Sequence, residues 1–282
     1  MPLALILSSH VAGSRVGGFA QALALAPFKI DAVVIPTVLY GRHPGWGPPG
    51  GAAVPQATFE GMLEGVAANG LFGLTDAVIT GYFATAAQVA AAARAIDAIR
   101  ANPRTGAFSP ATRVVVDPTM GDAGKGLYVP AEVADAIAAE LVPRADVVAP
   151  NAWELERLTG KSVSDPASAV EAARRLGRPT LVSSVIDGDE IGAVYADATQ
   201  SWFAAHARLP SAPNGTGDLL TALFTAWLIE GKSVSEALRR AVAGVARALA
   251  AAKTWSSPEL PIVALGGRLR APRTQVRLER LV

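Results

Sequence analysis

The 282-residue chain lacks cysteine and lacks an excess of charge of either sign. Without cysteine it can form no disulfide, no thiolate metal site and no cysteine nucleophile. This fits a cytoplasmic protein, which is the localisation that we expect. Its 25 Lys and Arg residues against 24 Asp and Glu give a net charge of +1, so we predict neither nucleic acid nor a membrane surface as a partner. The one basic cluster, residues 268–280, is interpreted as a solvated terminal segment rather than a polyanion site.

Long hydrophobic runs are also missing. No stretch reaches the roughly 18 consecutive apolar residues of a membrane-spanning helix without a glycine or a polar break. The opening segment MPLALILSSHVAGSRVGG has neither the basic start nor the extended apolar region of a signal peptide. Because 51% of the residues are hydrophobic and only 17% are charged, a large buried core is expected. We therefore predict a globular protein with a single domain, 1–282.

What the chain does contain is a regular alternation of short apolar runs and longer alanine-rich segments. The predicted buried strands are 3–8, 32–38, 76–81, 113–117, 146–150 and 179–185. The predicted helices between them are 55–69, 85–101, 130–142 and 166–177. This alternation is typical of parallel β-α-β units, and it predicts an α/β fold with helices on both faces of the sheet.

The pattern changes after residue 185. Residues 192–205 are expected to form a hairpin, and helices are expected over 216–230 and 233–253, followed by a short strand over 261–265. The segment 40–51, YGRHPGWGPPGG, has five glycines and three prolines in twelve residues, a density that neither a helix nor an interior strand tolerates. Because it follows a strand end, we favour a flap over a ligand above an inert surface loop.

Polar residues follow several predicted strands, in the turns SSH, TGY, DPTMGD and PNAWE. Ligands of open α/β sheets bind beyond the carboxyl ends of the strands. The motif NGTGD, 214–218, adds a glycine-rich turn at the start of an apolar helix, where unpaired amides attract an anion. A carboxylate repels phosphate, so Asp218 makes sense there as a base that takes a proton from a hydroxyl during phosphoryl transfer. From the motif alone, a helix cap is an equally good reading.

Two further motifs carry acids. Asp117 ends the run VVVD and suits Mg²⁺, which takes few protein ligands and keeps waters and phosphate oxygens; a turn-forming aspartate is the alternative. In PNAWELERLTG, Asn151 and Glu154 have the spacing of a capping box, and Glu154 could instead face the water shell of a metal.

These three motifs, in this order, resemble the ribokinase-like superfamily of small-molecule kinases. The segments ILSSHVAGSRVGG, TVLYGRHPGWG and VITGYFAT narrow the resemblance to the pyridoxal kinases, and it extends over nearly the whole chain. It implies a three-layer α/β/α sandwich with a mostly parallel central sheet. It also implies ATP-dependent phosphorylation of the 5′-hydroxymethyl group of pyridoxal in vitamin B6 salvage. Whether pyridoxine and pyridoxamine are substrates as well is left open. The implied partners are ATP, a B6 vitamer and a second copy of the chain, with Mg²⁺ as cofactor and a K⁺ requirement left open.

The resemblance also implies roles for single residues. Asp218 would be the base, and Gly215, Thr216 and Gly217 would form the anion hole. The vitamin would meet Ser9, Val16, His43 and Tyr82. The metal and the nucleotide phosphates would be organised by Asp117 and Glu154, with Ser183 and Asn214 among the ATP-binding positions. The other two histidines are assigned differently: His10 is left open, and His206 is interpreted as structural.

Some positions depart from the family pattern. Pro44 stands in the flap where many relatives have threonine, and Gly18 stands where they often have asparagine. Ser183 and Ser184 stand where some bacterial relatives have lysine. These changes put the contacts to the vitamin in doubt rather than the phosphoryl transfer. Two alternatives therefore stay open: a kinase for a related alcohol such as hydroxymethylpyrimidine, and a non-catalytic vitamer-binding protein.

Overall fold

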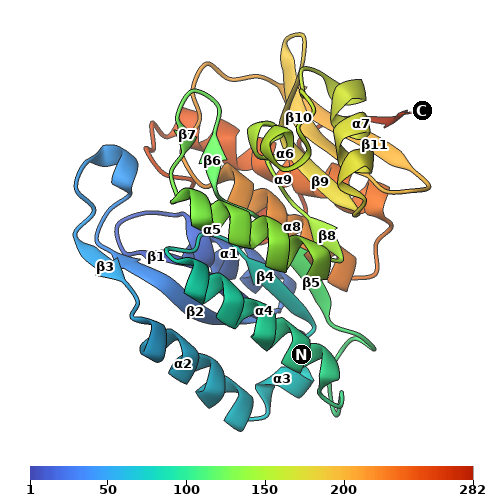
Figure 1. Ribbon diagram of the computed structural model, residues 1–282. Helices are drawn as coiled ribbons and strands as arrows, with labels where there is room; N and C mark the ends of the chain where they lie inside the picture. Colours follow the sequence, from blue (N-terminus) through green and yellow to red (C-terminus); the bar gives the residue numbers. More distant parts are fainter. Residues whose placement is uncertain (282) are drawn as a thin grey trace.

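The computed structural model describes residues 1–281 and has three layers, with helices on both faces of one ten-stranded sheet (Figure 1). The strand order is β12-β11-β10-β9-β8-β5-β4-β1-β2-β3. The parallel part consists of β1 (Leu3–Val11), β2 (Asp31–Tyr40), β4 (Ala77–Thr80), β5 (Arg113–Val116), β8 (Val147–Val148) and β9 (Thr180–Asp187). The antiparallel edges are β3 (Gly51–Ala53) on one side and β10 (Glu190–Ala196), β11 (Ser201–Ala207) and β12 (Arg277–Leu281) on the other. The predicted mostly parallel α/β sandwich is confirmed.

The helices cover the sheet in two layers, which Figure 1 shows in front of and behind the strands. Behind the sheet, α1 (Gly17–Leu25), α8 (Thr216–Ile229) and α9 (Val234–Thr254) enclose one hydrophobic core. The other layer is formed by α2 (Gln56–Ala68), α4 (Ala86–Ala101), α5 (Ala131–Ala136), α6 (Ala152–Thr159) and α7 (Pro166–Leu176). The short elements are the helices α3 (Leu71–Leu74), α10 (Ile262–Leu265) and α11 (Gly267–Arg270), the helical turns Ala26–Phe28, Pro44–Trp46, Ile137–Leu141 and Val142–Arg144, and the hairpin β6 (Gly121–Asp122) and β7 (Gly126–Leu127).

The prediction of a strand over 261–265 is wrong, because Ile262–Leu265 form helix α10. Ile262 and Leu265 are buried while Val263 is 65% exposed, which is a helical spacing that a run of five residues is too short to reveal. The basic tail is exposed at Arg268, Arg273 and Arg280, as expected of a solvated segment, but its end is held in the sheet, because β12 pairs with β11 and Arg277 forms ion pairs with three acids.

Other differences concern the segments around the site. Helix α1 begins directly at the glycine turn and was not among the predicted helices. The flap segment 40–51 contains a helical turn at Pro44–Trp46 and ends in β3, which pairs with β2. It is therefore a folded excursion between two paired strands.

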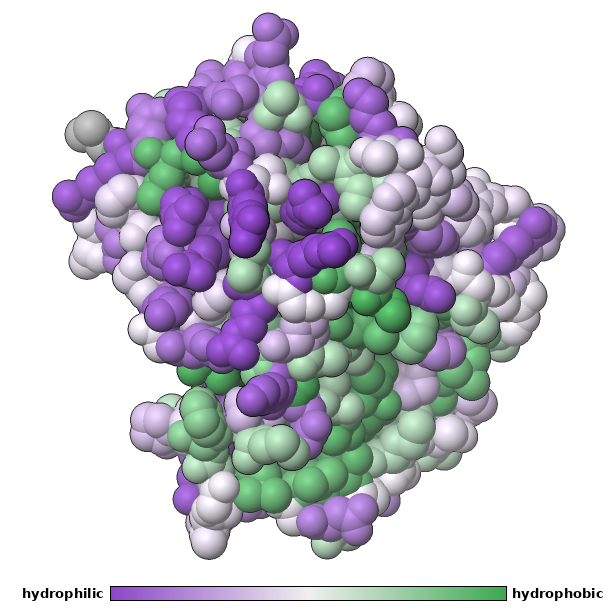
Figure 2. Space-filling view, turned by 180° about the vertical axis from the view of Figure 1, so that it is seen from behind, coloured by the Kyte–Doolittle hydropathy of each residue, from purple (hydrophilic) through white to green (hydrophobic). Residues whose placement is uncertain are grey.

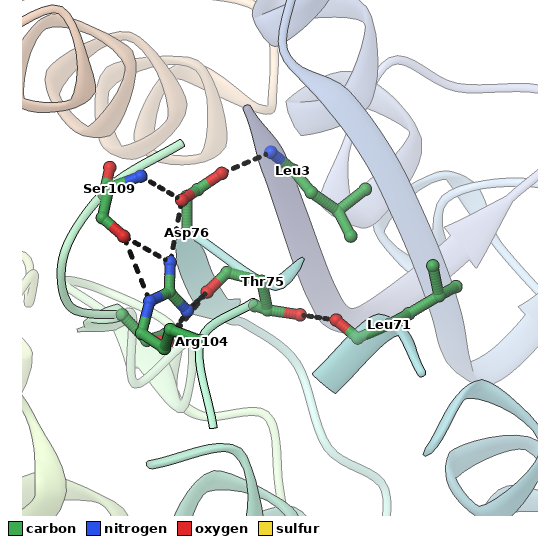
Figure 3. Close-up of polar contacts among 7 residues, drawn as sticks. Leu3, Leu71, Thr75, Asp76, Arg104 and Ser109 are labelled. Atoms are coloured by element: carbon green, nitrogen blue, oxygen red, sulfur yellow. Dashed lines mark hydrogen bonds and ion pairs between the residues drawn. The ribbon is translucent and has the colours of Figure 1, made fainter. Parts of the chain in front are cut away.

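The two edges of the parallel sheet differ in character. At the amino-terminal edge, Asp76 accepts hydrogen bonds from the backbone N–H groups of Leu3 and Ser109 and from Arg104, as Figure 3 shows. At the carboxyl edge the strands lead into the motifs singled out above, so this edge positions the candidate site. Among the described residues, no helix is long and apolar enough to cross a membrane.

Candidate active site

Asp218 lies at the junction of two helix starts. It is in the first turn of α8, whose N-cap is Gly215 in the left-handed region with φ 88°, and it makes no capping bond to its own helix. Instead its Oδ2 accepts a hydrogen bond of 2.8 Å from the backbone N–H of Gly17, the first residue of α1. Its Oδ1 lies 3.4 Å from the side-chain amide of Gln21. The helix-cap reading is therefore wrong, and the carboxylate connects α8 to α1.

The strand end of β1 meets the same junction. Gly17 has a φ of 61°, and a Cβ built on it would lie 2.2 Å from the hydroxyl oxygen of Ser9, so the two residues are in close contact. A Cβ on Gly215 would lie 2.4 Å from the carbonyl oxygen of Arg15 and 3.3 Å from Val16. The fold thus brings Ser9 and Val16 against the residues that hold Asp218 and the glycine turn.

Asp117, at the end of β5, is held by two hydroxyl groups. Its Oδ1 accepts from the hydroxyl of Thr119 at 2.6 Å and from that residue's N–H at 3.1 Å. Its Oδ2 accepts from the hydroxyl of Thr221 at 3.1 Å. Thr221 stands one helical turn after Asp218, on the same face of α8. Asp117 therefore forms the turn with Thr119, as the alternative predicted, and is also linked to the helix that carries Asp218; its role toward a metal stays a prediction.

Glu154 completes a capping box with Asn151 at the start of α6, as predicted. Its Oε2 accepts from the N–H of Asn151 at 2.8 Å, and its Oε1 accepts from the N–H groups of Met120 at 2.7 Å and Gly121 at 3.3 Å. Glu154 therefore fixes the loop that follows Asp117 as well as its own helix. Since both of its oxygens already accept backbone hydrogen bonds, it is better placed to act on a metal through water than as a direct ligand.

These three acids lie near one another and are electrostatically strained. Burial and the nearby Asp117 raise the pKa of Asp218 to about 7. Burial raises the pKa of Asp117, and burial together with Asp117 raises that of Glu154. Buried carboxylates that raise each other's pKa gain from a cation. Within residues 1–281, no group of three or more His, Asp or Glu side chains could hold a metal ion alone. A site with two carboxylates and no further protein ligand suits Mg²⁺, whose other ligands are phosphate oxygens and water.

A small cavity extends the site along α8 and α9. Ser183 and Ser184 of β9 line it, together with Thr216 and Gly217 at the start of α8. Its apolar walls come from α8, α9 and β10, namely Leu220, Val242, Val245, Ile191 and Ala193. His206 also lines this cavity, so its interpretation as merely structural is incomplete. Asn214 precedes the glycine turn, and its role stays a prediction.

Tyr82 and His43 are the two remaining residues that the sequence predicts to meet the vitamin. Tyr82 follows β4, its carbonyl oxygen accepts from the hydroxyl of Thr37 at 2.6 Å, and burial together with Tyr40 raises its pKa to about 12. His43 stands in the flap, where its Nδ1 accepts from the N–H of Gly45 at 3.0 Å. Burial and the charge of Lys125 lower the pKa of His43, opposed by Glu259. The flap therefore reaches the charged groups around the site.

The departure at Gly18 has a steric explanation. A Cβ at this position would lie 2.8 Å from Val34 and 3.3 Å from Ile6, so this chain has no room there for asparagine. Pro44 begins the helical turn of the flap, a position where proline fits because its missing N–H is not needed.

Four residues near the site were not found from the sequence. Thr221 could have been found, since it lies one turn beyond Asp218. Thr119 has a φ of 41°, unusual for a residue with a Cβ, which no sequence pattern announces. Glu259 accepts a hydrogen bond of 2.8 Å from the N–H of Arg15, which lies 244 positions earlier in the sequence. Gln21 contacts Asp218, which lies 197 positions later. Only the folded structure brings residues this far apart in sequence together.

Comparisons with known proteins agree with this geometry. A family model described as phosphomethylpyrimidine kinase matches residues 72–262. A pyridoxine/pyridoxal/pyridoxamine kinase of Bordetella avium is 35% identical over 262 residues, which cover 90% of this chain and 86% of that protein. A pyridoxal kinase of Deinococcus radiodurans is 30% identical over 291 residues, with 98% and 96% covered. The chain belongs to the pyridoxal kinase family.

Solved pyridoxal kinases share the whole architecture. The Leishmania donovani pyridoxal kinase in complex with ADP and pyridoxine is 27% identical, covers 99% of both chains and has a TM-score of 0.92. The same kinase in complex with ADP and pyridoxamine is 26% identical over 100% of both chains, also with a TM-score of 0.92. The expected place of the chain within the ribokinase-like superfamily is thereby confirmed.

Proposed function

We propose that this member of the pyridoxal kinase family transfers the γ-phosphoryl group of ATP to the 5′-hydroxyl of pyridoxal, with pyridoxine and pyridoxamine as further substrates. The observation that carries the proposal is the position of Asp218. Its carboxylate lies beside the free amides at the start of α8 and in contact with Gly17, which touches Ser9. An acid and an anion hole at one point are what phosphoryl transfer to an alcohol requires.

Each group has a defined task in this reaction. The amides of Gly215, Thr216 and Gly217 hold the phosphoryl group while the alcohol oxygen forms its bond to phosphorus and the bond to the ADP oxygen breaks. Asp218 takes the alcohol proton, and its pKa of about 7 suits a group that must accept and release a proton near neutral pH. Most of the rate enhancement then comes from positioning and charge neutralisation.

Mg²⁺ is the proposed cofactor, and its chemistry would be to neutralise the charge on the phosphates. Asp117 is the proposed ligand, with Glu154 acting through water, because these two buried acids lie together without a cation of the protein between them. Ser183 and the neighbouring cavity would take the rest of the nucleotide. A K⁺ requirement is tested by comparing rates with and without K⁺.

The proposal also includes a cytoplasmic homodimer. Figure 2 shows apolar side chains gathered on the lower part of the face behind the sheet. On this side Leu23 of α1 and Val34 of β2 are only partly buried. A contiguous apolar surface of this kind is typical of a subunit contact.

The central test is Asp218→Asn, which preserves size and the acceptor for Gly17 but removes the base. We expect phosphorylation of pyridoxal to fall by about 10²-fold or more, with folding and ATP binding unchanged. Asp97→Asn, which alters an exposed acid paired with Arg144, is the control and should keep full activity. Near-normal turnover by Asp218→Asn would remove Asp218 from the role of base.

Hydroxymethylpyrimidine is the second candidate substrate, favoured by the family model that matches the chain and by the departures from the pyridoxal kinase pattern at Pro44 and Gly18. Values of kcat/KM for the three vitamers and for hydroxymethylpyrimidine, measured by ATP consumption, decide between the two. A higher value for the pyrimidine would overturn the assignment to pyridoxal. Binding of pyridoxal without ATP consumption would instead indicate a non-catalytic relative.

A further inference from the structure

A second cavity lies on the face behind the sheet, away from the strand ends, and three arginines line it. Its volume is about 520 Å³, and its walls are Arg247 of α9, Gly267 and Arg268 of α11, and Ala271 and Arg273 of the segment that follows. Cavities of roughly 300–1,000 Å³ are typical of sites for small molecules. Three cationic side chains therefore line a space of ligand size, and no acid lines it.

These three arginines differ from two paired arginines in the same part of the chain. Arg270, between two of them in sequence, is paired with both carboxylate oxygens of Glu230 at 2.9 Å. Arg277 is paired with three acids. Within residues 1–281, in contrast, Arg247, Arg268 and Arg273 form neither an ion pair nor a side-chain hydrogen bond. Like charges brought together without a counter-charge repel one another, and an anion between them would remove that repulsion.

We propose that this cavity binds a small organic phosphate ester. A guanidinium group presents paired N–H donors that match phosphate oxygens, and a phosphate monoester carries a charge of about −1.5 to −2 near pH 7. The cavity is much larger than one phosphate group, and Gly267 and Ala271 leave it open at the wall, so an organic body accompanies the phosphate. Two sources share this chemistry: a phosphorylated vitamer, which the proposed reaction would produce, and a nucleoside monophosphate.

Helix α9 gives the site a physical connection to the nucleotide cavity. Val242 and Val245 of α9 line the cavity beside the anion hole, and Arg247 of the same helix lines the arginine cavity. The two spaces thus share one helix as a wall. A ligand that fixes Arg247 would therefore act on the helix that also shapes the nucleotide cavity.

The test compares the double variant Arg247→Gln/Arg268→Gln with Arg174→Gln/Arg175→Gln. The control removes the same charge from two exposed arginines of α7 that form no ion pair within the described residues. Binding of pyridoxal 5′-phosphate, AMP and inorganic phosphate is measured by calorimetry at 0.15 M salt, where non-specific charge effects are screened. We expect one of the two esters to bind the wild type and the control at a second site, and to bind that site at least about tenfold more weakly in the double variant, because two charged hydrogen-bond donors are removed.

The outcomes separate this inference from the proposed function. Phosphorylation of pyridoxal without added ester should be the same in the double variant and in the wild type, because neither arginine belongs to the active site. Equal binding of both esters by wild type and double variant would overturn the inference while leaving the kinase assignment intact. Binding of duplex DNA, but of neither ester, would make the surface a nucleic-acid contact and would equally overturn it. Should the double variant misfold, Arg268→Gln alone, at an exposed position, serves in its place.

Discussion

At the scale of single residues, the burial of Asp218, the proposed base, lowers the stability of the folded protein. Its pKa in the folded protein is about 7, whereas an unfolded aspartate titrates near 3.9. Between about pH 4 and pH 7 the folded state therefore holds a proton that the unfolded state has released, so stability falls as pH rises through this window and the loss persists above it. The carboxylate that we propose as the acceptor of the substrate's proton thus lowers the stability of the ligand-free protein near neutral pH.

This loss of stability on ionisation of Asp218 predicts that Asp218→Asn stabilises the protein. In Mg²⁺-free buffer we expect the free energy of unfolding of the variant to exceed that of the wild type by about 1–3 kcal/mol at pH 8, since each pKa unit corresponds to about 1.4 kcal/mol. The gain should shrink toward pH 4. Denaturant unfolding at both pH values measures it. The control Asp97→Asn should show no such gain, because the hydrogen bond to Arg144 lowers the pKa of Asp97. An Asp218→Asn protein that is less stable than the wild type at pH 8 would contradict the prediction.

His206 makes a second prediction at this scale. Its Nδ1 lies 2.9 Å from the carbonyl oxygen of Ala207. A carbonyl can only accept, so Nδ1 carries the hydrogen, and Nε2 of the neutral ring is an acceptor available to a ligand in the cavity that His206 lines. An acceptor at that point favours the amino group of adenine over the carbonyl group of guanine.

We therefore expect His206→Leu to reduce the preference for ATP over GTP by about tenfold, the effect of one hydrogen bond of about 1.4 kcal/mol. The value of kcat at saturating ATP should change little, since the anion hole and Asp218 are untouched. His206→Gln, which can still present an acceptor, should keep part of the preference. Steady-state kinetics with both nucleotides provide the readout, and an unchanged ATP-to-GTP ratio in the leucine variant would exclude this role for His206.

At the scale of elements, the side chain of Gln88 in α4 forms hydrogen bonds to both ends of the flap. Its side-chain amide donates to the carbonyl of Thr37 in β2 at 2.9 Å and to that of Val54, just after β3, at 3.0 Å. Its Oε1 accepts from the N–H of Ala84 at 3.1 Å, and the side chain is fully buried. One side chain therefore joins the two ends of the flap excursion to the helix after β4.

Replacing Gln88 with leucine would leave the carbonyl of Val54 and the N–H of Ala84 without partners, and the carbonyl of Thr37 would keep only its hydrogen bond from the N–H of Val54. We expect a loss of about 2–4 kcal/mol in the free energy of unfolding and a higher KM for the vitamer, because the flap loses its anchor. The matched control is Gln56→Leu, whose amide contacts only Glu60 and the carbonyl of Ala87 near the surface and which should cost less than about 1 kcal/mol. Equal losses in the two variants would show that the anchoring does not depend on Gln88.

The elements also show how far sequence reasoning extends. The parallel strands and the long helices could be predicted, because their apolar spacing is set locally by which face is buried. Helix α10 could not, since five apolar residues fit either period. Within the site, the acids Asp117, Glu154 and Asp218 were visible as motifs. The contact from Asp218 to Gly17 was not, because it joins two helix starts 201 positions apart, which only the assembled sheet brings together.

At the scale of the whole molecule, the edge opposite the active site holds the chain together. Asp76, whose side chain is fully buried, pairs with Arg104 at 2.8 Å and accepts from the N–H groups of Leu3 and Ser109 (Figure 3). This one carboxylate joins the first strand, the entry to β4 and the loop after α4. The arrangement contains no substrate-facing group, so its contribution is to stability alone.

This separation predicts that Asp76→Ala loses about 3–5 kcal/mol of unfolding free energy, since it leaves the partly buried Arg104 cation without a counter-charge and the N–H groups of Leu3 and Ser109 without their acceptor. Its KM and kcat, measured well below its melting temperature, should match the wild type. Asp76→Leu combined with Arg104→Met removes both charges and should recover part of the loss, which a double-mutant cycle quantifies. A large change in kcat of the folded Asp76→Ala protein would show instead that the two edges of the sheet are coupled, and that stability and catalysis are not divided between them.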